Sequence, residues 1–386
     1  MGKSFDTARN DGAQRAFQAR LETLDWDFAT QLSESPFSWL HWHPCRFPSQ
    51  LPSLLISRLS NVGETVLDPF MGSATTLVEA QRLGRPSIGI DINPISVLIA
   101  RAKTLDCSLD EIVRFIDRTT LEVQSNWSQL RLAQLPAQVQ ADKWYTSETL
   151  LGLRRLWTVV SGQSNAFATL SQAAFSSILL PCCREERHWG YVCDNTMPKT
   201  YRSADARDLF LKAMNKFKQA YLLRETETRG TAQMAEVLEG DASSMLQAMR
   251  EDSISCIVTS PPYFGVADYV KAQRLSMEWF SYDIETLRLQ EIGARSKRRR
   301  TTASSDYLKE MNAVFSDCYR VLRPGGHIGI VYGQSPSREK LYDSLMTHLR
   351  DVGFKQILVK SRRVSASRRM IASLSDEIVL IMQKEG

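Results

Sequence analysis

The stretch 259–263, Thr-Ser-Pro-Pro-Tyr, combines residue types suited to holding a flat ring that carries an exocyclic amino group. The apolar run 254–258 before it predicts a buried strand. Pro261 and Pro262 must end that strand in an abrupt turn, because neither can donate to a sheet ladder and each fixes φ. Ligands of open α/β sheets bind at the carboxyl ends of strands. The stretch is therefore the leading candidate for a binding or catalytic corner.

The amine of cytosine or adenine is a poor nucleophile, because its lone pair is delocalised into the ring. Acceptors placed on its N–H groups draw the nitrogen toward a tetrahedral shape and point the lone pair at an electrophile. The Ser260 hydroxyl and the Pro261 carbonyl are candidate acceptors, and Tyr263 is a candidate for stacking on the ring. Alternatively, the stretch is only a turn that ends a strand. Pro-Pro-Tyr alone favours that simpler interpretation, so the rest of the chain must decide.

A second motif has the strand–turn–helix form of a nucleotide-type site. Residues 65–67 predict a buried parallel strand, Gly72 permits a tight turn, and a helix is expected over 73–83. The turn and the helix N-terminus can meet a polar or anionic ligand group. The motif lacks the Gly-x-Gly-x-x-Gly fingerprint and the Lys-Ser/Thr ending of a phosphate loop, so a dinucleotide is not indicated.

Two further acids follow predicted strands. Asp91 ends the strand that starts at Ser87 and follows Asp68 by 23 residues, a position suited to accepting from ribose hydroxyls. Its alternative role is to cap the helix that begins at Pro94. Asp241 follows the strand at 235–239 and is a candidate partner for the adenine amine of a cofactor, or simply a helix cap.

The composition bounds the class of protein. At 386 residues, with 43% hydrophobic and 24% charged residues, the chain is long enough for one large or two ordinary globular domains. No apolar run approaches a membrane span and no apolar signal segment opens the chain, so we expect a cytoplasmic protein without a membrane partner. The seven scattered cysteines argue against a disulfide framework.

The net charge of +5 permits a polyanionic partner, and the densest basic cluster lies within 293–303. We expect this loop to be mobile and to clamp a phosphate backbone, although a solvated run without function is the alternative. The candidate DNA-binding residues are Arg295, Lys297, Arg298, Arg299 and Arg300.

The pattern divides the chain into an N-terminal helical segment (1–40), a catalytic domain (41–103 and 231–386) and an insertion (104–230). The insertion sits where the next strand of a doubly wound sheet should begin. Its candidate helices are 108–123, 147–160, 170–180 and 204–226. The histidines and cysteines at 41–45 and 182–193 fit no trusted zinc spacing, so no metal site is expected.

Three motifs together resemble the amino-methylating DNA methyltransferases that use S-adenosylmethionine. They are Asp-Pro-Phe-x-Gly-Ser-x-Thr-Thr at 68–76, Gly-Ile-Asp-Ile-Asn-Pro at 89–94, and Thr-Ser-Pro-Pro-Tyr at 259–263. The Ser-Pro-Pro-Tyr form is most similar to the cytosine-N4 enzymes, whereas adenine-N6 enzymes more often carry Asp or Asn at the position of Ser260. The cofactor motifs precede the catalytic one here, although many Ser-Pro-Pro-Tyr enzymes have the permuted order.

The resemblance implies a doubly wound, mostly parallel, seven-stranded α/β methyltransferase sheet with a helical insertion. It implies methyl transfer from S-adenosylmethionine to cytosine N4 in double-stranded DNA, with the base extruded from the duplex. The implied catalytic residues are Ser260, Pro261, Pro262 and Tyr263. The implied cofactor contacts are Phe47, Asp68, Pro69, Phe70, Gly72, Thr75, Asp91, Asn93, Asp241 and Ala242.

Recognition of a specific DNA site is expected from the insertion 104–230, from the basic loop, or from both. A cognate restriction endonuclease is a candidate partner. Three alternatives stay open, namely adenine-N6 methylation, methylation of an RNA base, and an inactive DNA-binding subunit. The intact set of Asp68, Gly72, Asp91 and Ser260 argues against the last of these.

Overall fold

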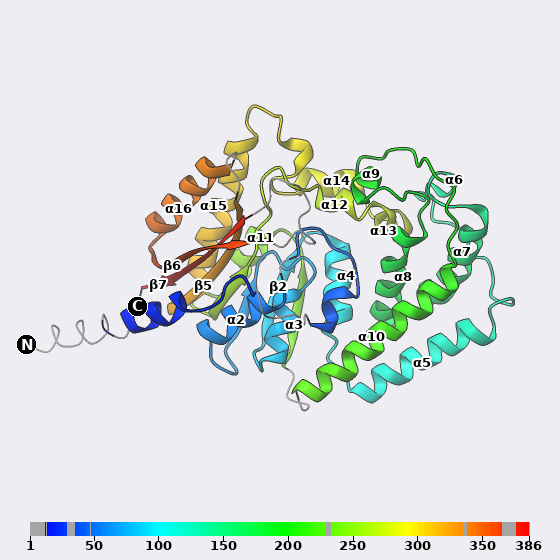
Figure 1. Ribbon diagram of the computed structural model, residues 1–386, viewed down its shortest axis with the longest axis horizontal. Helices are drawn as coiled ribbons and strands as arrows, with labels where there is room; N and C mark the ends of the chain where they lie inside the picture. The colour runs from blue at the N-terminus through cyan, green and yellow to red at the C-terminus, as the bar shows by residue number, and fades with distance from the viewer. Residues whose placement is uncertain are drawn as a thin grey trace, which may run out of the picture.

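The computed structural model describes residues 12, 14–28, 35–46, 48–228, 233–334, 338–364 and 376–385. Its centre is a seven-stranded sheet with the order β3-β2-β1-β4-β5-β7-β6 (Figure 1). The strands are β1 (Val66–Asp68), β2 (Ser87–Asp91), β3 (Ala235–Glu239), β4 (Ile254–Thr259), β5 (Leu322–Gln334), β6 (Phe354–Arg363) and β7 (Asp376–Lys384). The first five pair in parallel, and β7 lies antiparallel between β5 and β6. The predicted mostly parallel α/β fold with a final antiparallel hairpin is confirmed.

Helices cover both faces of the sheet, because the central strands alternate their side chains between two apolar layers. Val66 packs in one layer with α2, and the adjacent Leu67 packs in the other with α15 and α16. The helices of this part are α2 (Gln50–Leu59), α3 (Thr75–Arg82), α4 (Pro94–Lys103), α11 (Ala242–Ala248), α15 (Ala303–Val321) and α16 (Glu339–Val352).

The predicted insertion is helical, and its Trp144, Phe175 and Phe217 belong to an apolar cluster that also includes Val78 of α3 and Leu98 of α4. Its helices are α5 (Leu109–Ser125), α6 (Ala141–Trp144), α7 (Ser147–Ser161), α8 (Ala168–Cys182), α9 (Trp189–Cys193) and α10 (Ala206–Thr228). They gather beyond α4, at the right of Figure 1, while β5, β7 and β6 lie at the left. The four predicted helices of this segment are present, each within a few residues of its expected bounds.

Local details complete the fold. Residues 268–280 form two short helices, α12 (Tyr269–Ala272) and α13 (Arg274–Trp279). The turn at 323–326 lies within β5, where Ile254 pairs with Leu322 but Cys256 pairs with His327, so four residues leave the ladder. The basic loop contains a short 3-10 helix, η2 (Arg295–Lys297), after α14 (Ile284–Gln290). Another 3-10 helix, η1, spans Pro36–Trp39.

Within the described residues, no helix is both long enough and apolar enough to cross a membrane.

Candidate active site

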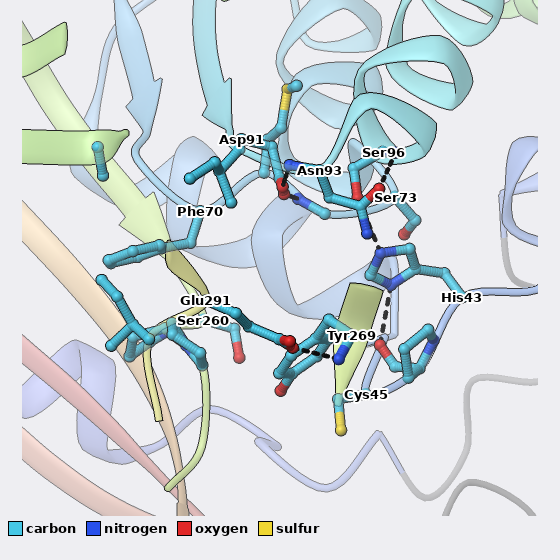
Figure 2. Close-up of a pocket in the computed structure, with 18 of the residues that line it drawn as sticks. His43, Cys45, Phe70, Ser73, Asp91, Asn93, Ser96, Ser260, Tyr269 and Glu291 are labelled. Atoms are coloured by element: carbon cyan, nitrogen blue, oxygen red, sulfur yellow. Dashed lines mark hydrogen bonds between the residues drawn. The ribbon is translucent and has the colours of Figure 1, made fainter. Parts of the chain in front are cut away.

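A cavity lies at the carboxyl ends of β1, β2, β3 and β4, where the two motif strands bring their turns together. It holds about 920 Å³ of space, part of it open to solvent. The predicted site residues that line it are Pro69, Phe70, Gly72, Thr75, Asp91, Asn93, Asp241, Ala242, Ser260, Pro261, Pro262 and Tyr263. Asp68 is buried beside it, and Phe47 lies outside the described residues. Segments almost 200 residues apart in sequence therefore share one cavity (Figure 2).

Asp68 joins the two central motif strands. The Thr259 hydroxyl at the end of β4 donates to its Oδ1 over 2.7 Å, and the Phe70 N–H donates to the same oxygen over 3.1 Å. Burial raises the pKa of Asp68 to about 6, although these hydrogen bonds oppose the change. Its Oδ2 is buried and has no hydrogen-bond partner within the described part of the chain. The site therefore retains an unused acceptor on a carboxyl that is mostly ionised at neutral pH.

Asp91 holds the turn that follows β1. Its Oδ2 accepts from the Gly72 N–H over 2.9 Å, and its Oδ1 accepts from the Asn93 N–H over 2.8 Å. Gly72 has φ +47, and a Cβ on it would lie 3.1 Å from the His43 ring. Burial raises the pKa of Asp91 to about 6, against the two backbone hydrogen bonds. Ribose binding by Asp91 stays a prediction, since each carboxylate oxygen can accept more than one hydrogen bond.

Helix caps surround the cavity, and they are not all where the sequence suggested. Asn93, not Asp91, caps α4, because its side chain accepts from the N–H groups of Ile95 and Ser96. The Asn93 Nδ2 is buried, and no described residue accepts a hydrogen bond from it. Asp241 caps α11 by accepting from the Ser244 N–H over 2.9 Å, so its capping role is observed. Its contact with an adenine stays a prediction.

The predicted catalytic corner, residues 260–263, contains a directed series of hydrogen bonds between hydroxyl groups. The Ser260 Oγ lies 3.0 Å from the Tyr263 hydroxyl, which also lies 3.3 Å from Glu377 Oε1 and 3.4 Å from the Val331 carbonyl oxygen. Glu377 also forms a buried ion pair with Arg362, so it acts as a carboxylate. Both outer partners of Tyr263 therefore only accept, which means that the Tyr263 proton points to them and that Ser260 must donate to Tyr263. The lone pairs of Ser260 are thereby left to accept.

The Tyr263 ring is 2% exposed and packs against Val266 and Ala267. Burial raises the pKa of Tyr263 well above its usual range, so the phenol keeps its proton. The corner is also held by Tyr307, whose hydroxyl donates to the Pro262 carbonyl over 3.1 Å. Stacking of Tyr263 on a base stays a prediction, and in this structure its hydroxyl is committed to the chain from Ser260.

The cavity lining also includes residues that sequence reasoning missed, among them His43, Cys45, Tyr269 and Glu291. His43 Nδ1 lies 2.9 Å from the Pro44 carbonyl and therefore carries the proton, while Nε2 accepts from the Ser96 hydroxyl. Burial lowers the pKa of His43 to about 3, so the ring is neutral. In the sequence, the run 41–45 raised only the question of a metal. No cluster able to hold a metal occurs among the residues that the structure describes.

The predicted DNA-binding residues do not behave alike. Arg298, Arg299 and Arg300 are exposed. Lys297 instead turns back onto the cavity wall, where its ammonium donates to the carbonyl oxygens of Leu289 and Glu291 over 2.8 Å and 2.7 Å. DNA binding by this cluster stays a prediction, and the three exposed arginines are its best candidates.

Comparison with known proteins gives one family. The model of N6_N4_Mtase, described as a DNA methylase, matches residues 16–101 and 254–386, more than half of the chain. The chain is 25% identical over 272 residues to the type II methyltransferase M.MvaI of Kocuria varians, a match over 64% of this chain and 58% of that enzyme. It is 23% identical over 287 residues to M.BsoBI of Geobacillus stearothermophilus, over 66% and 55%. The chain thus spans little more than half the length of these relatives.

Solved structures resemble the chain only weakly. An S-adenosylmethionine-dependent methyltransferase of Methanosarcina mazei is 11% identical with a TM-score of 0.35, over 86% of this chain and 96% of that one. TrmN of Thermus thermophilus is 13% identical with a TM-score of 0.36, over 90% and 52%. The fold assignment therefore rests on the strand order described above.

Proposed function

This chain belongs to the DNA methylase family N6_N4_Mtase. We propose that it methylates the exocyclic N4 of cytosine in double-stranded DNA, with S-adenosylmethionine as its cofactor. The observation that carries the proposal is the acceptor on Ser260, which opens into the same cavity as the cofactor motif. The Ser-Pro-Pro-Tyr form at 260–263 favours cytosine over adenine.

The chemistry of the cavity wall suits the cofactor. Among the described residues, Asp68 Oδ2 is an acceptor without a partner and Asn93 Nδ2 is a donor without a partner. S-adenosylmethionine offers an ammonium group, ribose hydroxyls and a carboxylate, which supply both kinds of partner. Asp68, Phe70 and Gly72 would hold the methionine part, Asp91 the ribose and Asp241 the adenine. When bound, the cofactor supplies an electrophilic methyl group.

The protein's own part in the reaction is to orient the amine and to keep water from it. Ser260 Oγ and the Pro261 carbonyl oxygen accept from the two N–H groups of the target amine, which turns its lone pair out of the ring plane. The Tyr263–Glu377 pair fixes Ser260 as an acceptor, so its hydroxyl proton cannot point at the amine. Ser260 lies in the wall of a cavity, so the base must leave the duplex to reach it.

Site choice and partners belong to the same proposal. The helical segment 104–230 is our candidate for target recognition, together with Arg298, Arg299 and Arg300. Exposed arginines on a short loop suit contacts with phosphates, which set affinity and salt dependence but not sequence. A restriction endonuclease partner stays a prediction.

The deciding experiment is mass spectrometry of nucleosides from DNA incubated with the protein and S-adenosylmethionine. We expect N4-methylcytosine, and we expect the Ser260→Ala variant to form far less of it. Ser125→Ala, a change at an exposed helix position, is the matched control. N6-methyladenine would keep the mechanism and overturn the choice of base. No methylated DNA, with methylated RNA instead, would overturn the substrate.

A further inference from the structure

Glu291 is a buried acid in the cavity wall that the mechanism above does not use. Its side chain lines the cavity and the residue is 5% exposed. Oε1 accepts from the backbone N–H of Tyr269, at the start of α12. Oε2 is fully buried and has no hydrogen-bond partner among the residues that the structure describes. Burying a polar atom without a hydrogen-bond partner costs free energy. A bound molecule that supplies the missing partner would remove this cost.

Glu291 is a neutral acid at pH 7. Burial raises its pKa to about 8, and nearby Asp268 raises it further, while the Tyr269 and Val270 N–H groups and Lys297 oppose the shift. The titratable and charged groups around it are Asp268, Tyr269, Lys297 and Cys193. Because Oε1 accepts a hydrogen bond, the proton resides on Oε2. Oε2 is therefore a hydrogen-bond donor for which an acceptor on a bound molecule is available only when the cavity is filled.

The position of Glu291 favours the base over the cofactor. Figure 2 shows Glu291 together with Ser260 and Tyr269 on one side of the cavity, and Asp91 with Asn93 on the other. Ser260 is the acceptor for the target amine, whereas Asp91 and Asn93 belong to the cofactor motif. If the target amine meets Ser260, a donor on the same side of the cavity lies on the side of the base rather than of the cofactor.

Resting on the proposed function, we propose that Glu291 is a specificity-determining residue, whose Oε2–H donates to the ring nitrogen next to the amine of the extruded base. That atom is N3 in cytosine and N1 in adenine, and both are acceptors. In thymine and guanine the same ring position carries an N–H, so two hydrogen-bond donors would face each other and no hydrogen bond could form. Ser260 and Glu291 then form an acceptor–donor pair that matches only the two bases with the required edge.

The experiment compares wild type, Glu291→Gln and Glu291→Ala on duplexes with cytosine or 3-deazacytosine at the mapped site. The deaza base keeps the amine and replaces N3 by C–H. We expect the wild type to lose roughly 10- to 100-fold in kcat/KM on the deaza base, the cost of leaving a buried donor without its acceptor. Glu291→Ala should lose as much on cytosine and show no further loss on the deaza base.

A pH profile separates hydrogen bonding from packing. Wild-type kcat/KM should fall as pH rises through about 8, because the carboxyl loses the proton that it donates. Glu291→Gln keeps an acceptor for Tyr269 and a permanent donor for the base, so it should recover most of the activity that Glu291→Ala loses and should show no fall near pH 8. Melting temperatures show whether each variant is folded, and Glu251→Ala, at an exposed position, is the control.

Two results would overturn the inference while leaving the proposed function intact. One is a wild-type enzyme that methylates cytosine but treats the deaza base equally well. The other is a Glu291→Ala variant that loses S-adenosylmethionine binding in calorimetry, which would assign Glu291 to the cofactor. If the wild type methylated no DNA base, the proposed function would fail, and this inference with it.

Discussion

The hydroxyl of Ser260 lies 3.0 Å from the hydroxyl of Tyr263, three residues along the chain, and the Tyr263 ring is buried beneath it. The second partner of Tyr263 is Glu377, on the antiparallel strand β7. A carboxylate cannot donate, so the order of the three residues fixes the direction of the Ser260 proton. The Ser260 hydroxyl, which we propose to be catalytic, is thus oriented by a residue 117 positions away in sequence.

Removing the hydrogen bonds that link Ser260, Tyr263 and Glu377 should lower turnover more than substrate binding. We expect Tyr263→Phe to reduce kcat roughly tenfold, because one hydrogen bond orients the Ser260 hydroxyl. Glu377→Gln should have a similar effect, since an amide can donate to Tyr263 and reverse the chain. The double variant should be no worse than Tyr263→Phe alone. Additive losses in kcat, measured beside melting temperatures, would show that the two residues act separately.

Gly72→Ala should weaken cofactor binding. Its φ of +47 is strained for any residue with a Cβ, and that Cβ would lie 3.1 Å from the His43 ring. Gly63→Ala is the control, because it shares the positive φ but meets nothing within 4 Å. We expect both to cost about 1 kcal/mol in the free energy of unfolding. Calorimetry should show weaker S-adenosylmethionine binding only for Gly72→Ala. Equal affinities for the two variants would contradict the proposed contact between the Gly72 turn and the cofactor.

Cofactor affinity should rise with pH as the Asp68 carboxyl ionises. Its pKa in the folded protein is raised to about 6, so the anion that accepts from the cofactor forms as pH rises through 6. Thr259→Val removes the donor to Oδ1 and should move this midpoint to higher pH. Calorimetric titrations between pH 5 and 8 test this, with Thr226→Val on exposed helix surface as control. An unchanged midpoint would exclude Asp68 as the titrating group.

The same pKa shift has a stability consequence of opposite sign. The Asp68 pKa is higher in the folded than in the unfolded chain, so the folded state holds its proton more tightly. The contribution to stability is fully present below the unfolded value and is lost as pH rises through about 6. Asp68→Asn should remove this part of the pH dependence, as measured by denaturant unfolding between pH 4 and 7.

Replacing Arg298, Arg299 and Arg300 by alanine should weaken DNA binding without affecting the cofactor. Each arginine that contacts a phosphate adds about 0.9 to the slope of log K against log salt, so its removal should reduce the slope by that amount. The control replaces Arg15, Arg20 and Arg58, which are also exposed but lie on the N-terminal segment and α2. An equal drop in affinity for both triple variants would mean that net charge alone drives binding.

Local sequence determined the strands, the two turns and the motif residues. Apolar runs ended by Pro-Pro or by Asp-Pro stop where a ladder cannot continue, so 259–263 and 68–76 could be placed at the carboxyl edge from residue types alone. The helices of the insertion followed from their apolar periodicity and caps. These features depend on neighbours within a few residues, which the sequence displays directly.

Only the tertiary structure revealed what these residues face. Glu291 and Glu377 have no local signal, because an acid in a strand or loop looks like a solvated charge until burial and a partner are known. Asn93 caps α4, although Asp91 was also a candidate for that role. The Asp91 side chain instead accepts a hydrogen bond from the Gly72 N–H in the turn after β1. Burial and contacts over a hundred residues apart set the pKa values and proton directions, and these arise only when the strands pair.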